Sequence, residues 1–136
     1  MVRKIIHDES VLGKVSSDAT IMDLGIAKDL EDTLKAHEGE CVGMAANMIG
    51  VLKNIIVFEN CGKIDTMFNP EIISSSGEYE IVEGCLSLEG KRMTKRFQEI
   101  TVKYKDKSFK ECTGNYSGFT AEIIQHEIDH LKGILI

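Results

Sequence analysis

The chain has 136 residues, of which 43% are apolar and 28% charged, and we predict a single globular domain over residues 1–136. Sixteen Lys and Arg against 22 Asp and Glu give a net charge of −6, which argues against a dedicated nucleic-acid-binding protein. No apolar run approaches the ~20 residues of a membrane-spanning helix, and the N-terminus turns acidic before any signal-like apolar stretch. Four widely spaced cysteines without such a signal suit reduced thiols, so we expect a cytoplasmic protein.

Residues 21–38 form the first predicted helix. Its apolar positions recur with helical spacing, at Ile26, Leu30 and Leu34. Thr20 and Asp23 have the spacing of a capping box at its start, and Gly39 follows its end. The next segment, residues 41–50, is rich in small residues, which allow the backbone to approach another group closely.

Strand signals dominate the middle of the chain. The apolar run 55–58 predicts a buried strand. Two short strands are predicted at 64–69 and 79–82, on either side of the turn-rich segment 74–77. Apolar and polar residues alternate over 100–104, as in a half-buried strand. Strands followed by a terminal helix predict an α+β fold and not a regular βαβ repeat.

The last predicted helix begins at Ser117 or Gly118 and runs to about Leu131. It contains the sequence HEIDH, an HExxH motif. Positions i and i+4 share one face of a helix, so His126 and His130 can meet one metal ion with Glu127 beside it. The alternative is an amphipathic surface helix with incidental histidines.

A catalytic metal site normally needs a third protein ligand and an open position. Only six residues, LKGILI, follow His130, and none is a good ligand. The third ligand must therefore lie upstream, unlike in the common HExxH endopeptidases. Cys85 stands out because Gly84 permits an unusual turn beside it, although this segment alone is only moderately specific. The other upstream candidates are His7, His37, Cys61 and Cys112.

Three motifs in order resemble the signature of the peptide deformylases. They are GMAANMIG at 43–50, EGCLS at 83–87 and HEIDH at 126–130, and FNPE at 68–71 also resembles the family. The resemblance implies an α+β fold with antiparallel or mixed β-sheets packed around the C-terminal HExxH helix. It also implies a hydrolase that removes the formyl group from the N-terminal formyl-methionine of nascent polypeptides and releases formate.

The same resemblance implies a set of site residues. Cys85, His126 and His130 correspond to the metal ligands, and Glu127 to the general base. The metal is one divalent ion, physiologically Fe²⁺, with Zn²⁺, Ni²⁺ or Co²⁺ as substitutes. A thiolate with two imidazoles is a donor set that favours such later metals over Mg²⁺ or Ca²⁺.

Substrate contacts are also expected from the resemblance. The backbone N–H of Leu86 corresponds to an oxyanion donor, while Val42 and Gly43 would flank the bound peptide. Arg92 would reach the peptide backbone. An apolar pocket for the methionine side chain would include Ile123 and Phe119. The basic group Lys91, Arg92, Lys95 and Arg96 is otherwise predicted to be a solvated turn.

Three residues depart from the family pattern. Met48 replaces the usual glutamine, and methionine cannot donate the hydrogen bond that glutamine gives to the oxyanion. Losing one such donor typically costs on the order of 10²–10³ in kcat. Cys41 replaces a glycine, and Glu122 lies where an apolar residue would suit methionine better, so we expect its charge to be solvated at the pocket rim.

These departures keep other functions open. One alternative is a deformylase-like protein with weak or altered activity, acting on another N-acyl group or binding peptides. A non-catalytic metal module would need a closed four-ligand site, which Glu127 argues against. Family members with an additional C-terminal helix are thought to dock on ribosomes through it. This chain stops soon after the last motif, so a transient ribosome contact rests on the resemblance alone and does not follow from the sequence. We expect neither direct nucleic-acid binding nor a membrane partner.

Overall fold

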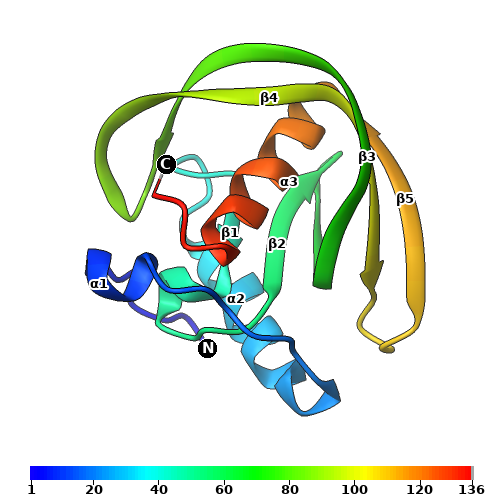
Figure 1. The fold of residues 1–136 in the computed structure, drawn as a ribbon. Coiled ribbons are helices and arrows are strands. Elements are labelled where there is room, and N and C mark those ends of the chain that lie inside the picture. The colour runs from blue at the N-terminus through cyan, green and yellow to red at the C-terminus, as the bar shows by residue number, and fades with distance from the viewer. Residues whose placement is uncertain (136) are drawn as a thin grey trace.

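The computed structural model describes residues 1–135, which form one five-stranded sheet with helices (Figure 1). In chain order the elements are α1 (Glu9–Leu12), η1 (Ile21–Asp23), α2 (Leu24–Ala36), β1 (Gly43–Ala45), η2 (Ala46–Ile49), β2 (Ile55–Asn60), β3 (Lys63–Cys85), β4 (Leu88–Lys105), β5 (Glu111–Ser117) and α3 (Gly118–Leu131).

The strands lie in the order β1-β2-β3-β4-β5, and each neighbouring pair is antiparallel. Figure 1 shows the long strands β3 and β4 arching over α3, with α2 on the other side of β1 and β2. The α+β class, with an antiparallel sheet packed around the last helix, is therefore confirmed.

Two groups of buried side chains hold this arrangement together. One joins α2 to β1, η2 and β2, and its members include Leu30, Leu34, Met48, Ile55 and Val57. The other packs α3 against the opposite face of the sheet, through Ala121, Ile124, Ile128, Phe58 and Val102 among others. Alternate residues of β2 therefore belong to opposite groups. Successive side chains of a strand point to opposite faces, and β2 is buried on both faces.

The two short strands predicted at 64–69 and 79–82 are parts of one strand, β3, which continues through the serine-rich segment. That segment was predicted to be a turn from its composition. Pairing with β4 stabilises it instead, for example through Ser75 opposite Ile100. Register shifts between Ile72 and Ser74, together with the positive φ of Gly77 (75°), accommodate the curvature of the strand.

The first long helix is shorter than the predicted 21–38. Its start is a 3-10 turn, and the predicted capping box between Thr20 and Asp23 is present there. The α-helix ends at Ala36, and Gly39 lies in the following turn with a φ of 88°. No helix among residues 1–135 is both long and apolar enough to span a bilayer.

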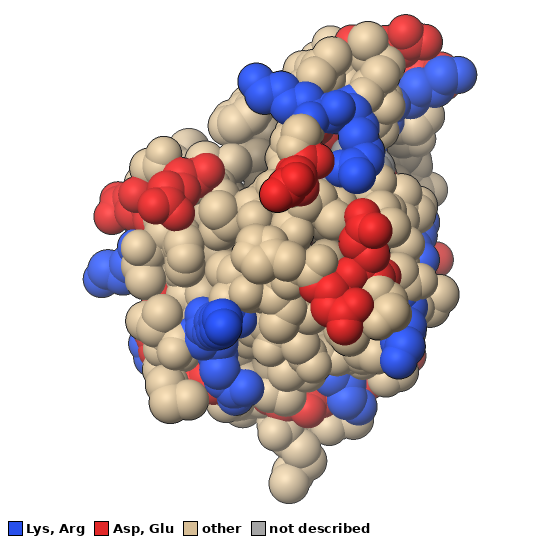
Figure 2. Space-filling model, turned by 90° about the vertical axis from the view of Figure 1, so that its left-hand side faces the viewer, with Lys and Arg blue, Asp and Glu red and all other residues tan. Residues whose placement is uncertain are grey.

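Charged side chains are distributed in small groups on the face shown in Figure 2. Lys and Arg gather near its upper end beside acidic residues, and further acidic and basic groups lie lower down, with uncharged surface between them. No continuous basic surface covers this face, in agreement with the net charge of −6.

Candidate metal centre

The C-terminal helix brings two imidazoles together. His126 and His130 are one turn apart on the buried face of α3, with exposed fractions of 8% and 0%. Their Nε2 atoms lie 3.1 Å apart, so both rings present the same kind of nitrogen to one point. The helix itself is fixed to the first motif because Asn47 Nδ2 donates to the backbone oxygen of His130 at 2.8 Å.

Cys85 reaches the same point from the last position of β3. The register shifts between Gly84 and Cys85, where β3 turns into β4. The Cys85 sulfur and one nitrogen each of His126 and His130 all lie within 4.8 Å of one another. The turn is tethered from outside, since His7 Nδ1 lies 3.0 Å from the carbonyl oxygen of Ser87. The structure therefore brings together the three residues expected as ligands.

A buried ionic network supports His126 from behind. Glu83 Oε1 lies 2.8 Å from His126 Nδ1, and Arg96 donates to both carboxylate oxygens of Glu83 at 3.0 and 2.7 Å. Arg96 also donates to Asp129 Oδ2 at 2.7 Å. Arg96 is only 3% exposed, so the prediction of a solvated turn for its basic group is wrong at this position. Such outer partners fix the orientation of a ligating ring and leave its other nitrogen free.

The two imidazoles have opposite protonation tendencies. Burial disfavours the charged form of His126, but hydrogen bonds with Cys85 and Glu83 outweigh it and raise its pKa to about 10. Burial lowers the pKa of His130 to about 3, and the positive charges of His126 and Arg96 add to the effect. His130 is therefore held neutral, the state in which an imidazole can ligate a metal.

Glu127 lies beside the imidazoles without a partner of its own. It is 4% exposed, and its Oε1 has no hydrogen-bond partner among residues 1–135. Burial raises the pKa of this carboxyl to about 7. Gly43 of β1 crosses directly over it: a Cβ at this glycine would lie 2.9 Å from Glu127 Oε2 and 2.7 Å from Ile123 Cγ2. The close approach explains why small residues are required in the first motif.

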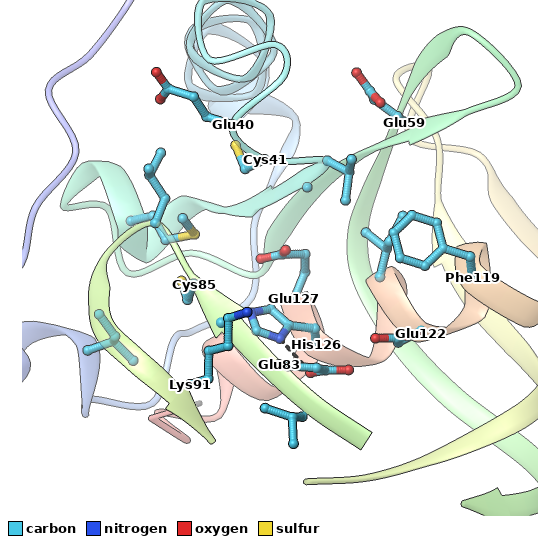
Figure 3. Close-up of a pocket in the computed structure, with 18 of the residues that line it drawn as sticks. Glu40, Cys41, Glu59, Glu83, Cys85, Lys91, Phe119, Glu122, His126 and Glu127 are labelled. Carbon is cyan, nitrogen blue, oxygen red and sulfur yellow. Dashed lines mark hydrogen bonds and ion pairs between the residues drawn. The ribbon is translucent and has the colours of Figure 1, made fainter. Parts of the chain in front are cut away.

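These side chains form the floor of a cavity of about 910 Å³. One wall comes from the end of α2 and β1, a second from the turn between β3 and β4, and a third from α3 (Figure 3). Figure 3 shows Glu127 and His126 near the centre, with Cys41 above them, Cys85 on one side and Glu122 on the other. A cavity of this size can enclose a short peptide end.

The residues present fit a bound divalent metal. One thiol and two imidazoles converge, and a carboxyl group with an unpaired oxygen stands next to them. Three protein ligands with one open position is the composition of a catalytic site, not a closed structural site. Soft sulfur and nitrogen donors suit Fe²⁺, Zn²⁺, Ni²⁺ or Co²⁺ and do not suit Mg²⁺ or Ca²⁺.

The chain matches known proteins over almost its whole length. The family model for polypeptide deformylase matches residues 2–136. A peptide deformylase of Clostridium beijerinckii is 48% identical over 136 residues, which cover 100% of both chains. The chain belongs to the peptide deformylase family.

Solved deformylase structures share the fold. A peptide deformylase from Legionella pneumophila superimposes with a TM-score of 0.89 at 36% identity, covering 99% of this chain and 83% of the other. A class I type b peptide deformylase from Acinetobacter baumannii, solved with Met-Ala-Ser bound, has a TM-score of 0.88 at 27% identity and covers 99% of this chain and 97% of the other. The deformylase fold thus extends over almost the whole chain.

Most of the substrate residues expected from the deformylase resemblance line the cavity. They are Val42, Gly43, Met48, Leu86, Phe119 and Ile123. Arg92 is not among the lining residues, whereas its neighbour Lys91 is. Adjacent residues of a strand point to opposite faces, so a difference of one position decides which side chain meets the cavity.

The residues that depart from the deformylase pattern also lie at the cavity. Met48 is 1% exposed, and its sulfur accepts a hydrogen bond from the backbone N–H of Ala45 at 3.5 Å. It fills the position without offering a donor. Burial raises the pKa of Cys41 to about 12, with further contributions from Glu127, Cys85, Glu40 and Glu59. This thiol is therefore protonated and a poor nucleophile.

Glu122 lines the cavity and is half-buried. Burial and hydrogen bonding with Glu83 raise its pKa to about 7. The network of Glu83, Arg96 and Asp129 was not identified from the sequence. Its only sequence signal is the Glu that precedes Gly84-Cys85. The contact with Arg96 cannot be read from the sequence, because even the strand register pairs Glu83 with Arg92 and Arg96 with Tyr79.

Proposed function

We propose that this protein is a metal-dependent peptide deformylase in which Cys85, His126 and His130 hold one divalent cation and Glu127 transfers the protons. The family activity is hydrolysis of a linear amide, the removal of the N-formyl group from nascent polypeptides. The observation that carries the proposal is the convergence of three ligand atoms within 4.8 Å beside a buried, unpaired carboxyl. We also propose that residues 1–136 act as one domain.

The chain's own residues account for the proton transfers. When bound, the cation would supply Lewis-acid polarisation of the formyl oxygen and lower the pKa of water in the open position. Glu127 Oε1, which lacks another partner, takes the proton of the attacking water and returns it to the departing amine. Gly43 limits the room available to this carboxyl, so Glu127 takes up and releases the proton at a fixed position.

The charge that develops on the formyl oxygen needs hydrogen-bond donors. The backbone N–H of Leu86, next to Cys85 in the turn between β3 and β4, is the proposed donor. Met48 cannot be a second one, because its sulfur is an acceptor and already faces the N–H of Ala45. The apolar side chains of Val42, Phe119 and Ile123 would surround the methionine side chain.

The metal is proposed to be Fe²⁺, with Zn²⁺, Ni²⁺ or Co²⁺ as functional substitutes. The donor set supports this range of metals without selecting among its members. A ferrous site with a thiolate ligand would be sensitive to oxygen and peroxide.

The substrates are proposed to be formyl-methionyl ends of nascent chains in the cytoplasm. The Acinetobacter baumannii deformylase, which was solved with Met-Ala-Ser, supports a peptide with N-terminal methionine as the ligand. A transient contact with the ribosome would place the enzyme near its substrate.

The decisive experiment measures formate release from formyl-Met-Ala-Ser by protein loaded anaerobically with Fe²⁺, with metal content determined on the same sample. We expect one metal per chain and formate release that is lost with a chelator and restored by Fe²⁺. Metal binding without formate release from any formyl-Met peptide would contradict the proposal.

Met48→Gln tests the alternative of weak or altered activity, which none of the comparisons supports. A glutamine would restore a side-chain donor, and we expect kcat on formyl-Met peptides to rise, by up to ~10² if one donor is missing. Met44→Leu, a buried apolar exchange next in the same motif, is the matched control. Absence of deformylation by both the native protein and Met48→Gln would favour a different acyl substrate.

A further inference from the structure

The two imidazoles of the metal centre are held in different ways. His126 Nδ1 lies 2.8 Å from Glu83 Oε1, which orients its ring. His130 Nδ1 is buried and has no hydrogen-bond partner among residues 1–135. A ligating histidine usually donates its second ring N–H to a fixed acceptor, and that contact sets the direction of the ring. The ring of His130 has no such contact with the described part of the chain, so its direction depends on the position of its backbone.

The backbone of His130 lies at the end of its helix, since α3 stops one residue later, at Leu131. The carbonyl groups of a last helical turn have no partner further along the helix, and helix ends fray. The backbone N–H of Gly133 donates to the carbonyl oxygen of His130 at 3.0 Å. This bond is local and moves together with the end of the helix. It cannot hold His130 in place relative to Cys85, which belongs to the sheet.

Asn47 of η2 supplies a long-range contact to the same carbonyl group. Its Nδ2 donates to the carbonyl oxygen of His130 at 2.8 Å and to that of Leu12 in α1 at 3.5 Å. Asn47 is 0% exposed, so water does not compete for these bonds. One amide group therefore connects the end of α3 with two other parts of the fold.

The residues that follow His130 are docked on the N-terminal segment by backbone contacts. The N–H of Ser16 donates to the carbonyl oxygen of Leu131 at 2.8 Å. Gly133, with a φ of 76°, passes so close to Gly13 that a Cβ at Gly133 would lie 2.5 Å from the Gly13 carbonyl oxygen. Within residues 1–135, Asn47 makes the one side-chain hydrogen bond to the backbone of His130 itself.

The chemistry of Asn47 indicates a role beyond stabilising the fold. Its Oδ1 is buried and unpaired among residues 1–135. A buried polar atom without a partner costs free energy, so an apolar side chain of similar size would serve folding about equally well. The benefit of the Nδ2 hydrogen bonds should then be found in the geometry of the metal centre.

We propose that Asn47 is a positioning residue of the metal centre, which sets His130 for coordination by holding its carbonyl group. The inference rests on the metal site of the proposed function. It assigns a role to a residue that does not line the cavity and acts only through His130. Asn47 thus does for the second imidazole, through the backbone, what Glu83 does for the first through the ring.

The test measures Co²⁺ binding by Asn47→Leu, which keeps the approximate volume of the side chain and removes its amide. We expect the affinity for Co²⁺ to fall ~10-fold, measured by competition with a chromogenic chelator. The visible absorption bands of bound Co²⁺ should also change, because they depend on the coordination geometry. Urea unfolding of the metal-free variant should remain close to that of the native protein, whereas a purely structural role would lower its stability without altering the bands.

Two further variants serve as checks. Asn47→Ala removes the same amide without the branched side chain of leucine, so an equal loss of affinity excludes overpacking as its cause. Asn69→Asp is the matched control, because Asn69 Nδ2 also connects distant segments, donating to the carbonyl oxygen of Ala19 at 3.0 Å. Asn69 does not line the cavity, and Asn69→Asp should keep the native affinity and absorption bands.

The possible results separate this inference from the proposed function, because metal binding is measured without catalysis. Native affinity and native absorption bands in both Asn47 variants would overturn the inference alone. An equal loss in Asn69→Asp, or Asn47 variants that no longer fold, would overturn it too, since Asn47 would then be a structural residue. Absence of Co²⁺ binding by the native protein would overturn the inference together with the proposed function.

Discussion

The two sides of the cavity are held in different ways. On the ligand side, Cys85 and the two histidines converge, and His126 is fixed by Glu83, Arg96 and Asp129 in turn. On the substrate side, the cavity is lined by Cys41, Val42, Gly43 and the Met48 side chain of η2. None of the departures from the deformylase pattern falls on Cys85, His126 or His130: Cys41 and Met48 lie on the substrate side and Glu122 on the adjoining helix wall.

This difference has a physical reason. A metal ion requires particular donor atoms at fixed distances, so each ligand and its outer partner is constrained. A backbone edge can hold a peptide whatever its side chains are, provided that they leave room. Side chains on the substrate side are therefore free to vary, and the following variants test how far that freedom extends.

Cys85→Ser should have the largest effect, because it removes a proposed ligand from the constrained side. We expect a greater loss of metal affinity and activity than the ~10–100-fold that follows loss of an outer partner. Metal content after dialysis and formate release on the same sample measure it. Cys112→Ser, a thiol on β5 that is outside the cavity, is the control and should bind metal normally. Full metal retention by Cys85→Ser would disprove its role.

Gly43→Ala tests whether the substrate side is constrained by space. The added methyl would lie 2.9 Å from Glu127 Oε2 and 2.7 Å from Ile123 Cγ2, so the carboxyl must move. A displacement of about 1 Å can cost ~10² in kcat, and we expect that loss with the metal retained. Gly25→Ala in α2 meets nothing within 4 Å and should keep its activity. An active Gly43→Ala enzyme would show that Glu127 needs no fixed place.

Glu83→Gln weakens the support of His126 without touching a ligand. The neutral amide cannot accept from Arg96 with two carboxylate oxygens, and the His126 ring loses its charged hydrogen-bond acceptor. We expect metal affinity to fall by ~10–100-fold, measured by competition with a chromogenic chelator. Glu80→Gln, exposed on the same strand, controls for charge and should bind metal as the native protein does. Unchanged metal affinity in Glu83→Gln would mean that the network of Glu83, Arg96 and Asp129 does not support metal binding.

Glu127→Gln should show the smallest effect, in the stability of the metal-free protein. The folded pKa of Glu127 is raised from 4.5 to about 7, so the folded state binds the proton more tightly than the unfolded state. Stability from this group is complete below pH 4.5 and is lost as the pH rises through 7. The free energy of unfolding of Glu127→Gln should equal that of the native protein near pH 4.5 and exceed it at pH 8, by ~3 kcal/mol at most.

Urea unfolding of both proteins at several pH values, with chelator present, measures the difference. Effects of other groups cancel in the comparison because they are common to both proteins. A difference that does not change with pH would mean that Glu127 is ionised at no cost in the folded state.

The sequence predicted those parts of the site that depend on local spacing. His126 and His130 share a helix face whatever surrounds them, and the helix 118–131 was predicted within one residue at its start. The buried strand at 55–58 was also found, because four apolar residues in a row leave few alternatives.

The parts that depend on long-range pairing were not predictable in the same way. Ser74–Gly77 reads as a turn, yet it is strand because β4 supplies its hydrogen bonds. Arg96 looked like a surface charge, yet its guanidinium pairs with Glu83 although the strand register places Arg96 opposite Tyr79. Lys91 lines the cavity and Arg92 does not, because adjacent side chains of a strand point to opposite faces of the sheet.

The hairpin of β3 and β4 also has a consequence for folding. The sulfur proposed as a ligand belongs to its turn, whereas the imidazoles belong to α3, which follows β5 in the chain. Before α3 has docked on the sheet, a cation would have to close a long flexible loop to find all three donors, at a considerable entropic cost. The centre should therefore capture its ion late, so that a chain still being synthesised, or misfolded at the hairpin, carries no reactive metal.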